Sequence, residues 1–168
     1  MDSTDSMNSV GSAEELGSVF TDALTEVIAT VSGFSFDVIA PPPESSESEE
    51  DNSFSGMIGI MSLVGSQKNI MFFLSAEESD MKVLCSFMSG VAQDEITRED
   101  MNDALCELAN MTAGNVKLRT GGADYMFGLS LPFAINGEKM SIVTKKRVNV
   151  FSRALGNGDI SVKLKIVC

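Results

Sequence analysis

Apolar residues recur at the spacing of an amphipathic helix in three stretches of the chain, at residues 12–33, 75–90 and 97–116. Each stretch opens with a hydroxyl residue that is followed three positions later by a carboxylate. This is the pattern of a capping box, in which the two side chains bond N–H groups that the start of a helix leaves without partners. The sequence therefore predicts three helices, of which the first two end at a glycine and whose N-caps are Ser12, Ser75 and Thr97.

Strand patterns fill the remaining sequence. The segments expected to be strands are residues 34–40, 54–64, 69–74, 125–131, 139–150 and 160–167. Gly65-Ser66 separates the second segment from the third, which predicts a β-hairpin with a two-residue loop. Pro132 ends the fourth segment, and a turn built around Gly156-Asn157-Gly158 joins the last two.

The order of predicted elements repeats, and so do the residues. Asp22–Gly33 aligns with Asp103–Gly114 at an offset of 81, close to half the chain, and Asp, Ala, Leu, Glu and Gly match in register. We therefore expect an α+β fold of two layers, in which duplicated helix-strand-hairpin units pack long helices on a mainly antiparallel sheet. The chain would then consist of a flexible N-terminus and a single domain of two pseudo-repeats: residues 1–11, then 12–168 with repeats 12–90 and 97–168.

Acidic residues are concentrated in the first part of the chain. The net charge at pH 7 is −12, but residues 1–100 carry 3 basic and 19 acidic side chains, whereas residues 101–168 carry 9 and 5. Part of this acidity is the tract Glu44–Asp51, which follows three consecutive prolines. Because proline restricts the backbone and like charges repel, residues 41–53 are expected to form a solvated acidic loop. A docking site is the alternative interpretation of this tract.

Composition excludes several classes of protein. The chain has no histidine, which excludes Ser-His-Asp and Cys-His catalysis and every metal site that needs imidazole. A net charge of −12 makes nucleic acid and anionic membranes poor partners. No apolar run approaches the length of a membrane span, and residues 1–11 are too polar for a secretory signal. Three widely spaced cysteines without a C-x-x-C pair fit a reducing, cytoplasmic compartment.

One face of the third predicted helix carries polar residues that could perform chemistry. Asp103, Glu107, Asn110 and Gly114 are spaced i, i+4, i+7 and i+11, which places them on one stripe of the helix. The simpler interpretation is a solvated helix face. Asparagine is a mediocre helix former, however, and at Asn110 it has no capping role, so an amide beside a carboxylate suits the orientation of a water or contact with another protein.

These residues resemble the signature of the CheC/CheX/FliY chemotaxis phosphatases. That signature is an acidic residue or Ser, then Glu, then Asn, with a proline about twenty residues further on; here the residues are Asp103, Glu107, Asn110 and Pro132. The string Glu107-Leu-Ala-Asn-Met-Thr-Ala-Gly-Asn-Val-Lys117 is similar to the corresponding helix of CheX. With the internal repeat, the resemblance extends over residues 12–168.

The first copy of the motif lacks the amide. Asp22 and Glu26 match the signature, but Ala29 stands where the asparagine would be. Two-site members of the family carry Glu and Asn on both long helices, so this chain resembles the single-site CheX type. We expect the first helix to be catalytically silent and to serve in packing.

The resemblance implies a phosphatase that acts on an aspartyl phosphate of a CheY-like response regulator. By analogy, Asn110 orients the attacking water and Glu107 pairs with the regulator's active-site lysine. Asp103 and Pro132 are the weaker candidates, and Met111 and Gly114 are expected to contact the partner. No metal or cofactor is expected on this chain, because the response regulator would supply Mg²⁺.

Other interpretations remain open. A non-catalytic module of the same fold could dock a response regulator or serve in a flagellar switch, although retention of Glu107 and Asn110 argues against it. An unrelated acidic scaffold is a third interpretation. The resemblance also suggests a homodimer, for which strands 139–150 and 160–167 would offer sheet edges. The sequence does not identify the cognate regulator or its pathway.

Two further features are interpreted as structural rather than functional. Cys106 precedes Glu107 and points away from the polar stripe, so it is interpreted as a small thiol of the core rather than a redox sensor. The cluster Lys145-Lys146-Arg147 is interpreted as surface charge, with contact to an acidic regulator as the alternative.

Overall fold

A computed structural model of the chain describes residues 13–40, 53–66, 68–120, 127–141 and 148–168. Its helices are α1 (Ala13–Ser32), α2 (Glu78–Ser89) and α3 (Arg98–Arg119). Its strands are β1 (Asp37–Ala40), β2 (Ser53–Val64), β3 (Asn69–Ala76), β4 (Gly128–Leu129), β5 (Phe133–Ser141), β6 (Val150–Gly156) and β7 (Ser161–Val167).

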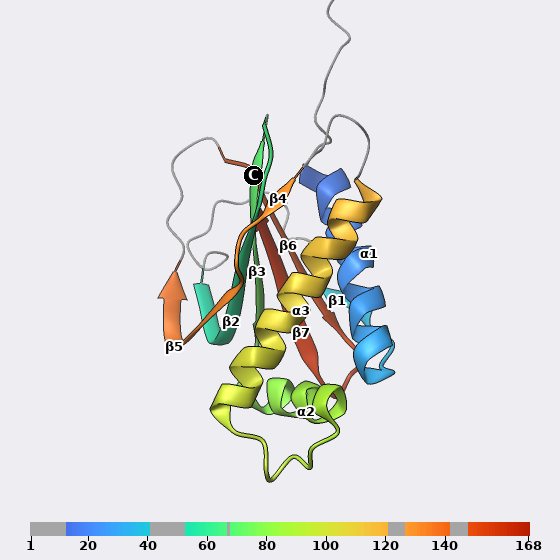
Figure 1. The fold of residues 1–168 in the computed structure, drawn as a ribbon, viewed down its shortest axis with the longest axis vertical. Coiled ribbons are helices and arrows are strands. Elements are labelled where there is room, and N and C mark those ends of the chain that lie inside the picture. The colour runs from blue at the N-terminus through green and yellow to red at the C-terminus, as the bar shows by residue number, and fades with distance from the viewer. Residues whose placement is uncertain (1–12, 41–52, 67, 121–126, 142–147) are drawn as a thin grey trace, which may run out of the picture.

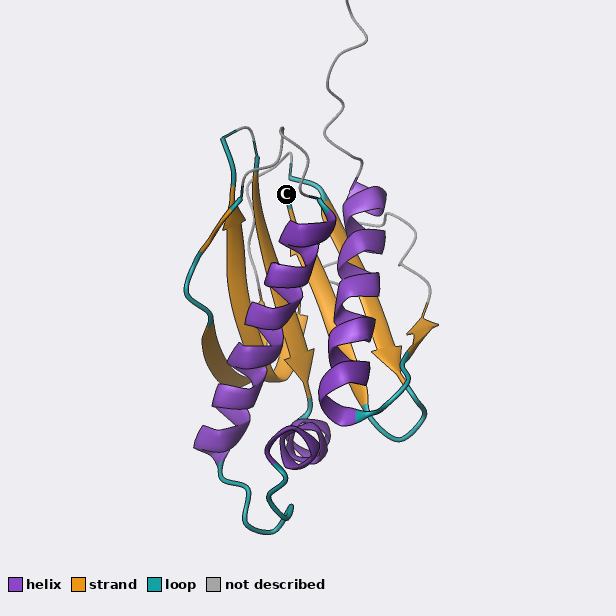
Figure 2. Cartoon of the chain, turned by 45° about the vertical axis from the view of Figure 1, so that its right-hand side comes forward, coloured by secondary structure: helices purple, strands orange, loops and turns teal. Residues whose placement is uncertain are grey.

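The strands form one seven-stranded sheet, and every pairing in it is antiparallel. The long helices α1 and α3 lie side by side on one face of this sheet and run in opposite directions (Figures 1 and 2). The short helix α2 lies at the end of the layer where α1 ends and α3 begins (Figure 1). The predicted α+β fold, with long helices packed on an antiparallel sheet, is confirmed.

The main core fills the space between the helices and the sheet. Its largest members come from both layers, and several are completely buried: Phe20, Leu24, Ile28, Phe72, Leu74 and Leu164. Strand alternation places a smaller cluster on the opposite face of the sheet, where Phe54, Ile58, Ile60 and Phe73 pack together. Burial of apolar surface between the two layers is the main source of stability in such a fold.

When β5 is left out, the order of the strands reads the same after the two halves of the chain are exchanged. Along the sheet the order is β1-β6-β7-β3-β2-β4, with β5 also paired to β2. If β1 is exchanged with β4, β2 with β6 and β3 with β7, the order becomes β4-β2-β3-β7-β6-β1. This is the original order read from the other end. The division into pseudo-repeats 12–90 and 97–168 stays a prediction, and we propose it on the strength of this symmetry.

Helix α3 lies directly against β2 at Gly59, a position with no room for a side chain. A Cβ atom built there would lie 2.9 Å from Leu105 Cγ and 3.2 Å from the Leu105 carbonyl oxygen. Both distances are tighter than ordinary van der Waals contact, and one of them is to backbone. Gly59 therefore sets how closely α3 approaches the sheet.

Of the three predicted capping boxes, the one at Thr97 is confirmed. The Asp100 N–H donates to the Thr97 hydroxyl, and the Thr97 N–H donates to the Asp100 carboxylate. The box predicted at Ser75 is wrong, because β3 continues to Ala76 and Ser75 pairs with both β2 and β7. The cap of α2 is instead Glu77, whose side chain makes no capping hydrogen bond. Ser12 lies outside the described residues.

Most of the predicted strands are present, but several begin or end at other residues than predicted. The hairpin of β2 and β3 is confirmed, but its loop spans residues 65–68 rather than two residues, and the Gly65 N–H donates to the Lys68 carbonyl. The strand expected over 34–40 is only β1, since α1 extends to Ser32 and residues 33–36, which begin with Gly33 at φ +74°, belong to neither a helix nor a strand. The segment 125–131 yields only β4 among its described residues.

The single strand predicted over 139–150 is wrong. That segment contains the end of β5 and the first residue of β6, which pair with different strands, β2 and β7. The turn after Gly156 and the strand β7 are confirmed, and the Asn157 side chain accepts hydrogen bonds from the N–H groups of Asp159 and Ile160. The expected loop 41–53 and the cluster 145–147 lie outside the described residues, apart from Ser53, which begins β2.

The expectation that residues 160–167 form a sheet edge is also wrong. Strand β7 lies inside the sheet, because it pairs with β6 on one side and with β3 on the other. Within the described residues β5 pairs with β2 alone, and β1 with β6 alone. Strand β4 likewise pairs with β2 alone. The homodimer therefore stays a prediction, for which β1, β4 and β5 are the edge strands within the described residues. No helix in the described part of the chain is both long and apolar enough to cross a membrane.

We predict that Gly59→Ala destabilises the protein by about 1–3 kcal/mol, because its methyl group would push Leu105 and the α3 backbone away from β2. Gly128→Ala is the control, since a Cβ atom there lies at an ordinary 3.7 Å from the Val64 carbonyl oxygen. Denaturant unfolding of both variants is the measurement. Equal stability of Gly59→Ala and the wild type would contradict this role for Gly59.

Candidate functional site

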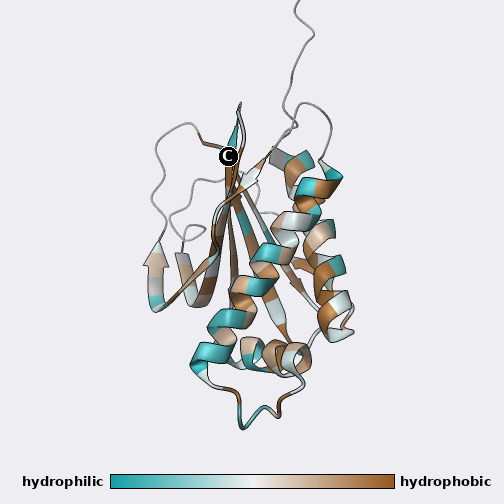
Figure 3. Ribbon diagram, viewed as in Figure 1, coloured by the Kyte–Doolittle hydropathy of each residue, from teal (hydrophilic) through white to brown (hydrophobic). Residues whose placement is uncertain are grey.

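The predicted polar stripe lies on the exposed face of α3. Asp103, Glu107 and Asn110 are exposed, and Gly114 is half-buried. Leu105 and Leu108 on the other side of the helix are buried in the core. Figure 3 shows hydrophilic residues on the outward side of α3. The stripe is therefore presented to solvent or to a partner by a helix whose opposite face is fixed to the sheet.

Both ends of α3 are held in place by polar contacts. At its beginning, the Thr97 capping box is joined by a hydrogen bond from Asn136 Nδ2 of β5 to Asn102 Oδ1, at 3.1 Å. At its end, Arg119 binds Glu26 of α1. These contacts fix the helix at both ends and leave its middle, around Glu107 and Asn110, exposed.

Glu107 and Asn110 are not bonded to other side chains in the part of the chain that the structure describes. Neither side chain makes a hydrogen bond or an ion pair there. They lie one helical turn apart and on the same side of α3, so a single external group could contact both. A carboxylate that can pair with a cation and an amide that can both donate and accept a hydrogen bond are thus exposed together.

The other predicted partner-binding residues lie around this pair. Met111 is half-buried beside Asn110, and Gly114 follows one turn later. A Cβ atom at Gly114 would meet nothing within 4 Å, so the helix backbone is uncovered there. Pro132 is half-buried and directly precedes β5, a strand that α3 contacts. The roles of these residues in binding stay predictions.

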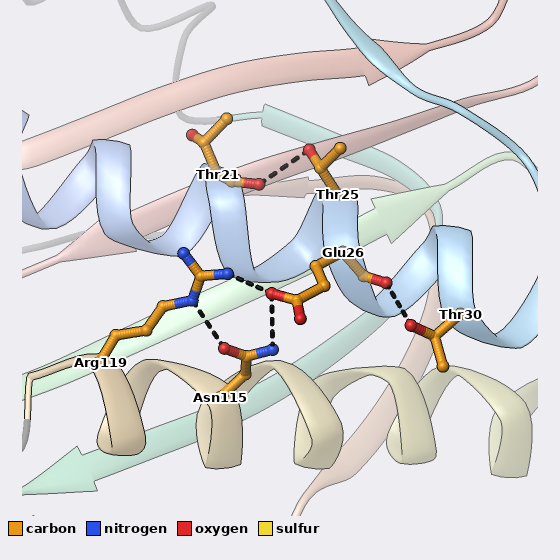
Figure 4. A network of polar contacts seen from close by, with 6 residues as sticks. All are labelled: Thr21, Thr25, Glu26, Thr30, Asn115 and Arg119. Carbon is orange, nitrogen blue, oxygen red and sulfur yellow. Dashed lines mark hydrogen bonds and ion pairs between the residues drawn. The ribbon is translucent and has the colours of Figure 1, made fainter.

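The first copy of the motif is arranged differently. Asp22, Glu26 and Ala29 are also exposed, on α1, but the Glu26 carboxylate accepts hydrogen bonds from Arg119 Nη2 and, at 3.4 Å, from Asn115 Nδ2 (Figure 4). Arg119 Nε in turn donates to Asn115 Oδ1 at 2.7 Å. The carboxylate that matches Glu107 in the repeat is therefore already occupied by side chains of α3. We call these three residues, Glu26, Asn115 and Arg119, the interhelix clamp.

The clamp changes the titration of Glu26. The hydrogen bond from Arg119, followed by the one from Asn115, lowers the pKa of the Glu26 carboxyl below its usual value of 4.5. The packing expected of α1 is confirmed, because Phe20, Leu24 and Ile28 are fully buried, although Ala29 itself is exposed. Sequence reasoning missed the clamp, since Glu26 and Arg119 are 93 positions apart and nothing local links them.

A shallow groove lies beside the clamp, between α1 and α3. Helix α1 contributes Glu26, Val27 and Thr30 to it. Helix α3 contributes Met111, Gly114, Asn115 and Leu118. The sequence did not predict the groove. Its signal was an apolar residue, Leu118, at a position of α3 that faces outward, and in the structure Leu118 is 84% exposed.

Cys106 is half-buried on α3, away from the stripe. Burial, followed by the nearby Asp103 carboxylate, raises the pKa of its thiol above the usual value of 9.0. A raised pKa leaves little reactive thiolate near neutral pH. This supports the interpretation of Cys106 as an unreactive thiol rather than a redox sensor.

Groups of acidic and cysteine side chains that could hold a metal ion are not found among the described residues. The expectation that Mg²⁺ comes with a partner stays a prediction.

The fold is that of the CheC/CheX-like chemotaxis proteins. The CheX structure from Vibrio vulnificus superimposes with a TM-score of 0.77 at 17% identity, covering 91% of this chain and 98% of that one. CheX from Desulfovibrio desulfuricans gives 0.75 at 19% identity, over 92% and 99% of the two chains. A complex of CheX with CheY, BeF3 and Mg²⁺ from Borrelia burgdorferi gives 0.70 at 18% identity, over 90% and 96%.

The sequence itself identifies the family. The profile described as "Chemotaxis phosphatase CheX" matches residues 57–154, which is more than half of the chain. The chain therefore belongs to the CheX family of chemotaxis phosphatases, as its motif and repeat predicted. Curated proteins, by contrast, provide no match to this sequence.

We predict that Arg119→Ala raises the pKa of Glu26 towards 4.5, because the largest cause of its lowered value is removed. NMR titration of the Glu26 side-chain carboxyl is the measurement, with Arg98→Ala as control, since Arg98 pairs with Glu78 instead. The clamp's contribution to stability should be complete above pH 4.5 and be lost as the pH falls through the lowered pKa of the folded state. Identical titration of Glu26 in the wild type and in Arg119→Ala would contradict the clamp.

Proposed function

We propose that this protein hydrolyses the aspartyl phosphate of a CheY-like response regulator, with Asn110 and Glu107 as the residues that act on the partner. The observation that carries the proposal is the pair itself, an exposed carboxylate and amide without partners on the outward face of α3. Membership of the CheX phosphatase family supports the reaction class. A solved complex of another family member with CheY supports the choice of partner.

The reaction needs little chemistry from this chain. An aspartyl phosphate is a mixed anhydride and is already activated, and Mg²⁺ held by the regulator neutralises charge on the phosphoryl oxygens. Water attacks phosphorus, the bond from phosphorus to the aspartyl oxygen breaks, and the products are inorganic phosphate and the free aspartate of the regulator. The remaining requirement is a water held in line with that bond.

Asn110 meets this requirement through its carboxamide. The amide oxygen accepts a hydrogen bond from the water and so fixes the direction of its lone pair, without acting as a base. This matches the role of the glutamine that orients water in GTPases. Because Asn110 lies on a helix fixed at both ends, the position of the amide is set before the partner binds.

Glu107 would fix how the regulator is positioned along α3. Its carboxylate is free to pair with the regulator's active-site lysine, which would place Asn110 one turn away at the phosphoryl group. Asp103 lies one turn before Glu107 on the same stripe and would contact the edge of the regulator. Met111, Gly114 and Pro132 complete the proposed surface.

We predict that Asn110→Ala lowers the rate of regulator dephosphorylation by about a hundredfold or more and leaves binding nearly unchanged, because orientation of the water is lost. The control is Gln93→Ala, which removes an exposed amide from the segment between α2 and α3, away from the stripe. The measurement is the decay of phosphate on a panel of CheY-like receiver domains. Full activity of Asn110→Ala would contradict the proposed mechanism.

Glu107→Lys should weaken both binding and turnover, because a lysine there would face the regulator's own lysine. Binding and decay are measured on the same panel. Should the wild type bind a receiver and fail to accelerate decay on any of them, the protein is a docking or switch module, and Glu107 and Asn110 are interface residues only.

A further inference from the structure

The groove between α1 and α3 has polar residues in its lining but offers an apolar surface. The Thr30 hydroxyl donates to the Glu26 carbonyl oxygen at 2.8 Å. The side chains of Glu26 and Asn115 are bonded within the interhelix clamp. Val27 also lines the groove but is only 4% exposed. With the polar groups bonded inside the protein, Met111 and Leu118 remain to contact an occupant.

Leu118 is exposed to an extent that the protein itself does not explain. Its side chain is 84% exposed, although it belongs to a helix whose inner face is packed in the core. Burying a leucine side chain against a partner is favourable, because apolar surface is removed from water. A leucine at this position is therefore suited to contact with another molecule.

Gly114 lies between Met111 and Leu118 and leaves the backbone of α3 uncovered at the groove. Glycine inside a helix is less favourable than alanine. At Gly114 no contact within the described structure requires it, since a Cβ atom would meet nothing within 4 Å. A glycine at this position allows an occupant to approach the helix more closely than any other residue would.

The position of the groove identifies its occupant. Leu118 is eight residues from Asn110, which along a helix is about 12 Å. A protein interface of standard size covers roughly 800 Å² on each partner, which corresponds to a radius of about 16 Å. A receiver domain centred on Asn110 would therefore cover Met111, Gly114 and Leu118 as well.

We infer that this groove receives an apolar side chain from the surface of the receiver domain, beside its phosphorylation site, and so selects which receivers bind. The inference rests on the proposed function, because Asn110 fixes where the receiver lies. Glu107 and Asn110 would act on groups common to all phosphorylated receivers, whereas the groove would contact a side chain that differs among them. Affinity at the groove then discriminates between receivers without changing the chemical step.

The test uses Leu118→Ser and Gly114→Ala with a receiver that the wild type dephosphorylates. Leu118→Ser should raise KM about tenfold with little change in kcat, because an apolar contact used equally in binding and in the transition state affects binding alone. Leu118→Met should restore most of the affinity. Val64→Ser is the matched control, since Val64 is 51% exposed at the end of β2 and lies away from α3 on the sheet face opposite the helices.

Gly114→Ala separates a role in binding from a role in folding. The added methyl group meets open space and favours the helix, so the melting temperature should stay the same or rise. Binding of the receiver should nevertheless weaken, because the methyl group occupies the space that the partner needs. A purely structural role for Gly114 would give no such loss of affinity.

If Leu118→Ser and Gly114→Ala both keep the wild-type KM while Asn110→Ala loses turnover, the groove does not bind the receiver. The proposed phosphatase mechanism would then still hold. Absence of dephosphorylation and of binding with every receiver would overturn both. A raised KM in Val64→Ser equal to that in Leu118→Ser would also contradict the groove, since the effect would then not depend on its location.

Discussion

The close contact between α3 and β2 at Gly59 is the constraint on which the rest of the structure depends. It fixes the buried face of α3, with Leu105 directly over the glycine, and thereby fixes which residues face outward. Because a helix has 3.6 residues per turn, burying Leu105 and Leu108 leaves Asp103, Glu107 and Asn110 on the exposed side. The exposed stripe is a consequence of how α3 is packed.

The two copies of the motif, on α1 and α3, have different surroundings. Strands from residues 12–90 and from residues 97–168 are interleaved in one sheet, so neither segment has a separate sheet of its own. Glu107 makes no hydrogen bond or ion pair with the described residues, whereas its counterpart Glu26 binds Arg119 and Asn115 and stabilises the packing of α1 against α3. The same residue type is therefore exposed on α3 and joins two helices on α1, where Ala29 stands in place of the amide.

The sequence predicted what depends on local spacing. The three helices, the α+β class, the Thr97 cap and the outward stripe all follow from periodicity over a few turns. The prediction from sequence was wrong where pairing with distant strands decides the structure. Ser75 belongs to β3 because β2 and β7 flank it. Residues 139–150 include parts of both β5 and β6, because these strands pair with different neighbours. The clamp and the groove arise from contact between α1 and α3, which no local pattern contains.

The structure of this protein in complex with a receiver domain that carries a stable phosphoryl mimic tests the central claim most directly. The account predicts that Asn110 lies at the mimic, with its amide oxygen within hydrogen-bond distance of a water in line with the phosphorus position. It also predicts that the Glu107 carboxylate pairs with the receiver's lysine. A receiver bound elsewhere, with Glu107 and Asn110 still exposed to solvent, would contradict it.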